Sequence, residues 1–500
     1  MDEFGTVIST FEGPCTRKFS FVIKKGTMVK RGQFVELPVE GGKLIGRVAD
    51  VFKTNRYFMR PESVEKYESS KPMGDIFPVS NWEYLVADVV PLGVYGKEER
   101  FEEVCFPPSP GTKVYEPEHD ILSKFLGLDN KGLEIGELPY HNINVKLNLT
   151  RLLQKHLAIL AISGAGKSYL VSVIIEELIK RKKEDGQLAT MIVDTHGEYV
   201  SFAEDPNYAD RIIVFPGNEI KIGLPGLTSR QISEFLPKLS PAQVRELARL
   251  LREMKGEKKH FGIDELINKI EEDEKAKSAT KDVLISVLYD LKETGLFGAS
   301  DYPGAKELAR QGKVSIIDLS SFISSRKKQM VVAHLARKLF NNRRNSKIPP
   351  FLLVLEEAHQ FVPETARAEN AISRGIIQTI AREGRKFHAS LCLISQRPIQ
   401  LSTTALSQCN THIILRVTNP YDLDHIGRSS EGITKDVLNQ ISGLRVGTGL
   451  IVGEGVNFPV FVRIRRRKSK ESKRGIPLEE AAKEFSERVK KKKEDAKSFM

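Results

Sequence analysis

A short run of glycine, lysine and serine has the residue types and the spacing that bind phosphate groups. Residues 163–168 read Ser-Gly-Ala-Gly-Lys-Ser, and they separate an apolar run, 157–162, from a helical pattern, 169–181. In a strand, loop and helix of this kind, backbone N–H groups and the positive helix end surround phosphate oxygens. Lys167 would neutralise phosphate charge, and Ser168 would bind Mg²⁺. The predicted ATP ligands are Ser163, Gly164, Ala165, Gly166, Lys167 and Ser168.

This loop departs from the most common phosphate-binding pattern at one position. The pattern begins with glycine six residues before the lysine, and Ala161 stands there in this chain. Because alanine rarely adopts a positive φ, we expect the loop to begin in an ordinary backbone conformation. A chance glycine-rich turn is the alternative, which the coincidence of strand, loop, lysine, serine and helix disfavours.

Two adjacent carboxylates follow another apolar run. Glu356 and Glu357 come directly after residues 351–355. The carboxyl ends of parallel strands form the edge where open α/β sheets bind ligands. Phosphoryl transfer needs a metal clamp and an oriented nucleophile, so we assign Glu356 to Mg²⁺ through water and Glu357 to polarising the attacking water. A pair of solvated acids at a strand end is the alternative.

A glutamine occupies the same kind of position after a third run. Gln396 follows the apolar residues 390–394, where its amide could sense the terminal phosphate or the attacking water. A loop glutamine without a role is the simpler explanation when the residue is taken alone. The two preceding motifs favour a role in catalysis.

A polar motif also follows the apolar run at 190–193. It reads Asp194-Thr195-His196-Gly197-Glu198-Tyr199. One histidine without cysteines provides too few ligands for zinc. We therefore expect Asp194, His196 and Glu198 to support the site from behind or to face a subunit interface.

Arg382 is the candidate for a residue that acts on a neighbouring subunit. It lies in Arg382-Glu383-Gly384-Arg385-Lys386, after a helical pattern at 372–381. In a ring, such an arginine would stabilise charge on the phosphoryl group in the adjacent site. The alternative is that these cations stabilise the negative carboxyl end of the helix and pair with Glu383.

The elements that must position these residues alternate between strand and helix. From residue 156 onward, apolar runs of four to six residues alternate with helical patterns, which predicts an α/β core with a parallel sheet over residues 141–462. The strands stop between about 228 and 304, where three helical patterns at 240–254, 263–275 and 280–296 indicate a helical insertion.

The two ends of the chain have other patterns. Residues 1–95 contain short β-rich runs with a tight hairpin at 39–43, which predicts a small β-barrel. Residues 96–140 are rich in proline, glycine and charge, so we expect a linker there. Residues 463–500 form a basic tail, in which Leu478, Ala481, Ala482, Phe485 and Val489 make an apolar helical stripe that must pack somewhere.

Composition bounds the class of protein. With 500 residues, 40% hydrophobic and 28% charged, the chain is long enough for two or three domains. It contains no apolar stretch long enough to cross a membrane, and Asp2 and Glu3 do not suit a signal peptide, so we expect a cytoplasmic protein. The four dispersed cysteines suggest neither a zinc site nor a disulfide framework.

The charge is concentrated at one end. The net charge is +12, and residues 463–500 alone hold 15 Lys or Arg and 7 Asp or Glu. The rest of the chain is nearly balanced. The positive charge therefore supports a polyanionic partner only if the tail contacts it; a solvated basic tail is the alternative.

Together these motifs resemble the HerA family, archaeal hexameric DNA translocases or helicases within the HerA–FtsK superfamily of P-loop ATPases. The resemblance includes Lys155-His156, the loop at 163–168, the motif at 194–199, Glu356-Glu357-Ala358-His359, residues 381–386 and Ser395-Gln396-Arg397-Pro398. It covers essentially the whole chain. It implies an amino-terminal barrel, a RecA-like core with a helical insertion and a helical carboxyl-terminal brace.

The resemblance also implies an activity and partners. These are a homohexamer that pumps double-stranded DNA, with no membrane association, and that works with the NurA nuclease in end resection for recombinational repair. It implies that Lys167, Ser168, Glu356, Glu357 and Gln396 serve the nucleotide of their own chain. Arg382 would act from the neighbour, Lys155 stands where the family can carry an arginine near the nucleotide, and Ile464 and Arg465 would cap the nucleotide of an adjacent subunit.

Two other functions remain open at this point. One is a protein-moving ATPase of the secretion type, which the lack of membrane segments disfavours. The other is a nucleotide-gated scaffold that activates a nuclease without translocation, which the presence of Glu357 disfavours. Hydrolysis alone does not establish movement.

Overall fold

The computed structural model divides the chain into two compact units. It describes residues 2–9, 13–55, 58, 61–69, 83–96, 100–236, 239–365, 371–430, 433–471, 478–480 and 482–487. The first unit contains residues 1–132, 136–147 and 456–463, and the second contains residues 133–135, 148–455 and 464–500.

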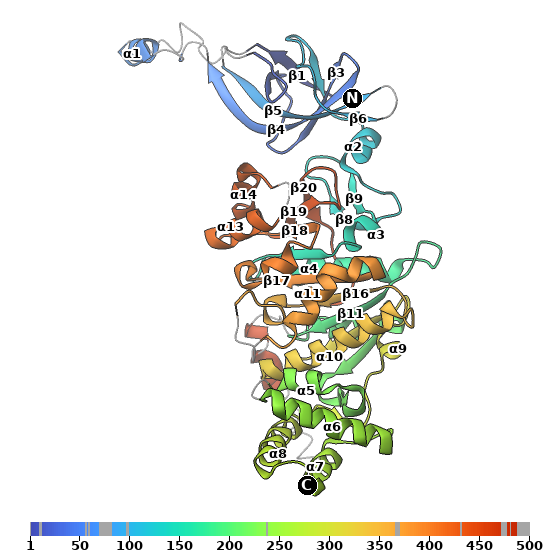
Figure 1. The fold of residues 1–500 in the computed structure, drawn as a ribbon. Helices are drawn as coiled ribbons and strands as arrows, with labels where there is room; N and C mark the ends of the chain where they lie inside the picture. The colour runs from blue at the N-terminus through green and yellow to red at the C-terminus, as the bar shows by residue number, and fades with distance from the viewer. Residues whose placement is uncertain are drawn as a thin grey trace. The chain divides into compact units, whose positions relative to one another are not determined.

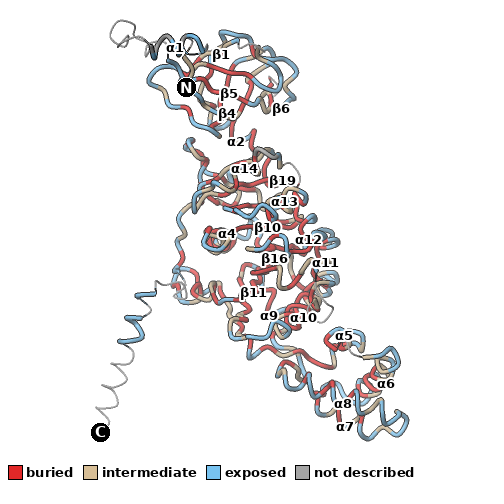
Figure 2. The backbone as a smooth tube through the Cα atoms, turned by 90° about the vertical axis from the view of Figure 1, so that its left-hand side faces the viewer, coloured by how far each residue is buried: buried red, intermediate tan, exposed pale blue. Residues whose placement is uncertain are grey.

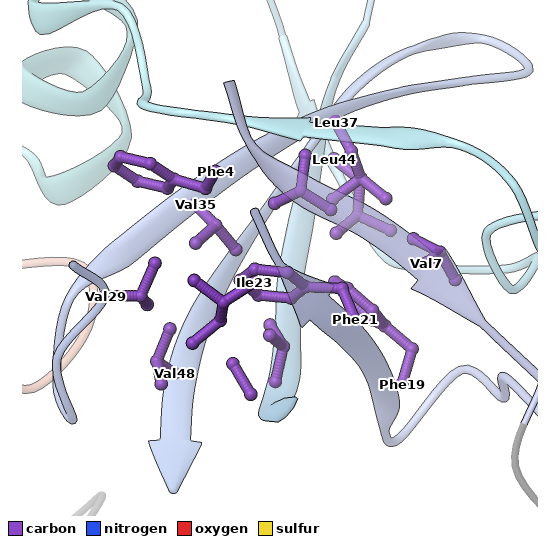
Figure 3. Close-up of a cluster of buried hydrophobic side chains, with 13 residues drawn as sticks. Phe4, Val7, Phe19, Phe21, Ile23, Val29, Val35, Leu37, Leu44 and Val48 are labelled. Carbon is purple, nitrogen blue, oxygen red and sulfur yellow. The ribbon is translucent and has the colours of Figure 1, made fainter. Parts of the chain in front are cut away.

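The first unit contains a closed β-barrel of six strands in its described part (Figure 1). The strands are β1 (Glu3–Ile8), β2 (Phe19–Ile23), β3 (Phe34–Val39), β4 (Gly42–Asn55), β5 (Glu83–Gly96) and β7 (Lys113–Tyr115), in the order β2-β1-β7-β3-β4-β5. Pairing of β2 with β5 closes the barrel. Inward-pointing side chains, among them Phe4, Phe21 and Leu44, fill its interior (Figure 3). The barrel predicted from the β-rich pattern is confirmed.

The predicted hairpin is also present. Val39 pairs with Gly42, which leaves Glu40 and Gly41 as a two-residue loop. Gly41 has a φ of 104°, a conformation that glycine adopts without steric cost.

The linker expected at 96–140 is wrong. Strand β7 from this range pairs with both β1 and β3 inside the barrel, and β6 (Phe101–Glu102) pairs with β5. Helix α2 (His119–Leu126) buries Ile121, Leu122 and two further apolar residues. Proline and glycine mark the turns between these short elements, and the elements themselves are too short to show a period.

The second unit is built on a sheet in which seven neighbouring strands are parallel to one another. The order is β12 (Ile212–Pro216), β15 (Val314–Asp318), β11 (Ala189–Asp194), β16 (Phe351–Leu355), β17 (Ala389–Ser395), β10 (Leu157–Leu160) and β18 (Thr411–Ile414). Strand β19 (Thr448–Gly453) adds to β18 in the antiparallel sense. Strand β8 (Leu133–Glu137) begins in this unit, whereas β9 (Asn144–Leu147) and residues 460–463 of β20 (Val460–Ile464) belong to the first unit. The predicted α/β core is confirmed.

Helices cover both faces of this parallel sheet, which explains why its strands are apolar throughout. Helix α4 (Lys167–Lys180) lies on one face, and α11 (Arg374–Glu383) and α12 (Thr403–Leu406) lie on the other (Figure 2). Helix α10 (Ser325–Arg344) packs against α11. The remaining core helices are α3 (Leu149–Leu153), α9 (Ala305–Leu308), α13 (Pro420–Ser429) and α14 (Lys435–Ser442).

The helical insertion lies where the strand pattern stops. It contains α5 (Ser229–Phe235), α6 (Pro241–Glu257), α7 (Ile263–Glu272) and α8 (Ser278–Glu293). Thr228 and Ser240 cap α5 and α6 through reciprocal bonds with Gln231 and Gln243. The last three helices correspond to the three helical patterns in the sequence.

The carboxyl-terminal residues are described in part. Residues 478–480 and 482–487 are helical, and Leu478 and Phe485 are exposed. Ala481 and Val489, which the predicted apolar stripe also includes, lie outside the described residues. No helix in the described part of the chain is both long enough and apolar enough to cross a membrane.

Candidate nucleotide-binding and catalytic site

The carboxyl ends of four neighbouring parallel strands form one edge of the second unit. Leu355 of β16 is level with Val193 of β11 and with Leu393 of β17. Ser395, at the end of β17, is level with Leu160 of β10. The four segments that follow these strands therefore leave the sheet at the same edge, as the sequence predicted.

The phosphate loop, residues 163–168, joins β10 to α4. Gly164 and Gly166 have φ of 75° and 96°, and Gly166 is the N-cap of α4. Both glycines therefore occupy the left-handed region that other residues adopt only with strain. Ala161 has no positive φ, so the start of the loop accepts alanine, as expected. Ser163 is exposed, Ala165 is buried, and Lys167 and Ser168 are half-buried.

Lys167 contacts Glu357 across this edge. Its Nζ donates to Glu357 Oε1, and both side chains are largely buried. Glu357 has a φ of 49°, a strained conformation for a residue with a side chain. Its other oxygen lies 3.3 Å from Nδ1 of His359, which is also 3.2 Å from the Ser395 hydroxyl. Burial lowers the pKa of His359, while the negative charge of Glu357 acts to raise it. Among the described residues, Oε2 of Glu357 has no hydrogen-bond partner.

Glu356 is buried and held on one oxygen only. Its Oε2 accepts from the backbone N–H of Thr195 at 3.0 Å and from the Thr195 hydroxyl at 3.1 Å. Among the described residues, Oε1 has no hydrogen-bond partner. Burial, together with the negative charges of Asp194 and Glu198, raises the pKa of Glu356 to about 9, and Lys167 opposes this.

A magnesium ion fits these residues. The buried Oε1 of Glu356 lacks a donor, and so does Oε2 of Glu198, whose negative charge acts on Glu356. A divalent cation favours ionised oxygens and relieves repulsion between them. Ser168 lies in the first turn of α4, where its hydroxyl would complete the protein's share of the ligands.

Asp194 stabilises the backbone conformation of the motif at 194–199, which contains the Thr195 that binds Glu356. Its Oδ1 accepts from the backbone N–H groups of His196, Gly197 and Glu198, at 2.6–3.3 Å. Its Oδ2 accepts from the N–H of Tyr199 at 2.9 Å. Asp194 thus supports the site from behind through the backbone, while the His196 side chain is exposed.

Gln396 follows β17 immediately and is half-buried at the same edge. Strand β17 lies between β16 and β10, so Gln396 emerges between the segment with Glu356 and Glu357 and the phosphate loop. A role for Gln396 in sensing the terminal phosphate stays a prediction.

Lys155 and Arg382 lie at the opposite edge of the sheet. Lys155 precedes β10 and pairs with Glu454, so the structure does not bring it to the phosphate loop of its own chain. The length of β10 separates Lys155 from the phosphate loop, and a contact of Lys155 with a nucleotide stays a prediction. Arg382 is exposed near the end of α11, ahead of β17.

The structure shows which groups Ile464 and Arg465 contact within their own chain. Arg465 donates to Glu176 and Glu177 of α4 in its own chain, at 2.8 Å each. The Ile464 N–H donates to the carbonyl oxygen of Gly447, and the Ile464 side chain is buried. Both side chains therefore have contacts within their own chain, and a cap on a neighbour's nucleotide by this region stays a prediction.

The sequence gave no role to three residues that lie inside the quoted motifs. Thr195 contacts Glu356, and His359 contacts Ser395, so each of the three contacts a side chain of a different segment. Their position directly after adjacent predicted strands was the available signal.

Comparison with known proteins agrees with this geometry. A family model described as "Helicase HerA, central domain" matches residues 133–339. A DNA double-strand break repair helicase HerA from Pyrococcus furiosus is 29% identical and covers 91% of both chains. The protein of the same name from Saccharolobus solfataricus is 29% identical, over 87% of this chain and 88% of the relative.

A solved structure has the same fold. VirB4 of Thermoanaerobacter pseudethanolicus superposes with a TM-score of 0.54 at 15% identity, covering 68% of this chain and 98% of the other. The phosphate loop lies within the matched residues 133–339. The chain has the phosphate loop of P-loop ATPases and is similar to HerA helicases along most of its length.

Proposed function

We propose that this protein is an ATP-driven motor that moves double-stranded DNA through a homohexameric ring. It would work with a NurA-type nuclease in resecting DNA ends during the repair of double-strand breaks. The observation that carries the ATPase part is the contact of Lys167 with Glu357 beside the unpartnered oxygen of Glu356. The DNA substrate rests on relatives named as break-repair helicases.

The chain's own residues divide the work of hydrolysis. Lys167 and the N–H groups of the phosphate loop would bind the terminal phosphates. A phosphate at Lys167 competes with Glu357 for the same ammonium group, so nucleotide binding would free Glu357 to orient the attacking water. Ser168 and Glu356 would hold Mg²⁺, which offsets phosphate charge when bound. His359 would keep Glu357 directed at the water.

Coupling to a neighbour would depend on the opposite edge of the sheet. Arg382 is exposed there, away from its own phosphate loop, which suits an arginine that enters the adjacent site. The helical residues 478–480 and 482–487 would form the brace between subunits, because Leu478 and Phe485 are exposed in the single chain.

The first test is steady-state ATP hydrolysis with and without linear double-stranded DNA. We expect DNA to stimulate turnover several-fold and added salt to reduce the stimulation, because contacts to phosphates depend on salt. Glu357→Gln should reduce turnover about 100-fold or more. Glu293→Gln, an exposed control at the end of α8, should change nothing.

Each other outcome has a meaning. DNA could leave ATP turnover unchanged in the free protein but stimulate it in the complex with the nuclease. That result would support the motor and would mean that the nuclease is a component of it. If turnover stays unchanged by DNA even in that complex, the motor is wrong and a nucleotide-gated scaffold replaces it.

A further inference from the structure

The segment that follows β20, residues 465–470, runs along the helix that carries the phosphate loop. We call it the strap. Glu176 of α4 is completely buried, and its Oε1 accepts at 2.7 Å from the N–H of Lys468 and from both the N–H and the hydroxyl of Ser469. Its Oε2 accepts from Arg465, whose guanidinium also binds Glu177. Although burial alone would raise it, these donors hold the pKa of Glu176 below its usual value.

The strap also reaches the first turn of α4. The backbone N–H of Arg467 donates to the Tyr169 hydroxyl at 2.7 Å. Tyr169 is two residues from Lys167 and adjacent to Ser168. Seven residues separate Tyr169 from Glu176, which is about 10 Å along a helix. The strap therefore fixes α4 at two points, one of them beside the residues that bind phosphate.

A third set of contacts joins the strap to the segment after the Asp194 motif. This segment is the 3₁₀ helix η3 (Val200–Glu204) and Asp205. The N–H of Lys470 donates to Asp205 at 2.9 Å, and the Ser201 hydroxyl donates to the Lys470 carbonyl at 3.2 Å. The guanidinium of Arg467 lies over the ring of Phe202, 5.7 Å from its centroid.

The start of the strap is joined to the other side of the phosphate loop. The N–H of Ile464, directly before Arg465, donates to the Gly447 carbonyl at 2.8 Å. The backbone nitrogen of Gly447 would lie 3.9 Å from a Cβ at Gly166. The phosphate loop thus lies between a turn held by Ile464 and a helix held by the strap.

We propose that the strap is a positioning element for the nucleotide: through Arg465 and Tyr169 it sets where α4 presents Lys167, Ser168 and its first N–H groups to the phosphates. The inference rests on nucleotide binding at the phosphate loop and is independent of DNA. A helix displaced by a fraction of an ångström would bind phosphate less tightly, because charge-assisted hydrogen bonds depend strongly on geometry.

The test measures nucleotide affinity and heat stability in the same variants. Arg465→Gln removes both contacts to α4, and Arg466→Gln removes the same charge from the exposed neighbouring residue. Tyr169→Phe removes only the acceptor of the Arg467 N–H and keeps the ring. Binding of a fluorescent ATP analogue gives Kd, steady-state hydrolysis gives KM and kcat, and a thermal scan gives Tm.

We expect Arg465→Gln to weaken nucleotide binding about tenfold, as the loss of a charge-assisted pair predicts. Tyr169→Phe should weaken it about threefold, the effect of one neutral hydrogen bond. Both should raise KM far more than they lower kcat. Arg465→Lys, which keeps one of the two contacts, should lie between wild type and Arg465→Gln. Arg466→Gln should bind as wild type does.

The contrary result is a strap that only stabilises the fold. Arg465→Gln and Tyr169→Phe would then lower Tm while Kd stays at the wild-type value. If Arg465→Gln does not fold, Tyr169→Phe decides the matter alone: an unchanged Kd rejects the proposal. If DNA does not change ATP hydrolysis by the wild-type protein, the proposed motor is contradicted. The test of the strap by nucleotide affinity would still be valid.

Discussion

Thr195 orients Glu356 with two donors, its backbone N–H and its hydroxyl, both directed to the same oxygen. Thr195→Val removes the hydroxyl and keeps shape and backbone. Because a hydrogen bond to a charged group is worth more than a neutral one, we expect kcat to fall about tenfold. The Mg²⁺ concentration that gives half-maximal hydrolysis should rise, since Glu356 would be free to turn from the metal. Magnesium titrations of ATP hydrolysis measure both.

Thr190→Val is the matched control, because Thr190 lies at the other end of β11 and is also buried. An identical fall of kcat in both variants would mean that the loss comes from a disturbed strand β11 and not from the orientation of Glu356.

At the scale of residues, the sequence predicts best those parts of the site that lie in one continuous segment. The phosphate loop and the adjacent glutamates were identified because strand, loop and helix follow one another in a single segment. The contact of His359 with Ser395 needs two strands side by side, and no spacing within one segment encodes which strands those are.

At the scale of elements, His156 joins the end of α11 to the start of β17. Its Nδ1 accepts from the Leu391 N–H, and its Nε2 faces the Ala381 carbonyl, at 2.9 Å each. Burial lowers the pKa of His156 from 6.5 to about 4. Between these values the unfolded chain binds a proton that the folded chain does not, so stability rises with pH there and is lost on acidification.

We therefore expect Tm to fall as the pH is lowered from about 7 to about 5. Buried His141 and His412, whose pKa is also lowered to about 4, contribute in the same direction. His156→Gln should flatten the profile even if it lowers Tm, whereas exposed His260→Gln should not. Thermal scans across pH decide this, and a profile that His156→Gln leaves equally steep would contradict it.

Short elements were also where the sequence failed. Strand β7 has three residues, and its place in the barrel depends on pairing with β1, more than 100 residues away. Three residues carry no measurable alternation, so proline and glycine nearby dominated the pattern and indicated a linker. Core strands such as β10, β16 and β17, which are four to seven residues long, were predicted closely, whereas β12 was not identified.

At the scale of the whole molecule, the proposed ring divides each site between two chains. Arg382→Ala and Glu357→Gln should each abolish turnover alone, the first on the neighbour's site and the second on its own. Co-expression of the two should restore part of the activity, because some interfaces then combine an intact Glu357 with an intact Arg382. ATP hydrolysis by the purified mixed assembly measures this.

The control is Glu357→Gln with Lys167→Ala, two changes that both affect the site of their own chain. That mixture should restore nothing. Equal activity in the two mixtures would place Arg382 outside the shared site and favour its alternative role at the end of α11.

The strap also has a consequence for how the chain is made. Glu176 emerges from the ribosome early, and the donors that it needs at Lys468 and Ser469 follow 292 and 293 residues later. A buried carboxylate without donors is costly, so α4 cannot settle in its final place until they arrive. Such long-range pairing slows folding, and it ties completion of the nucleotide site to synthesis of nearly the whole chain. A nascent chain interrupted before the strap would therefore lack a complete nucleotide site.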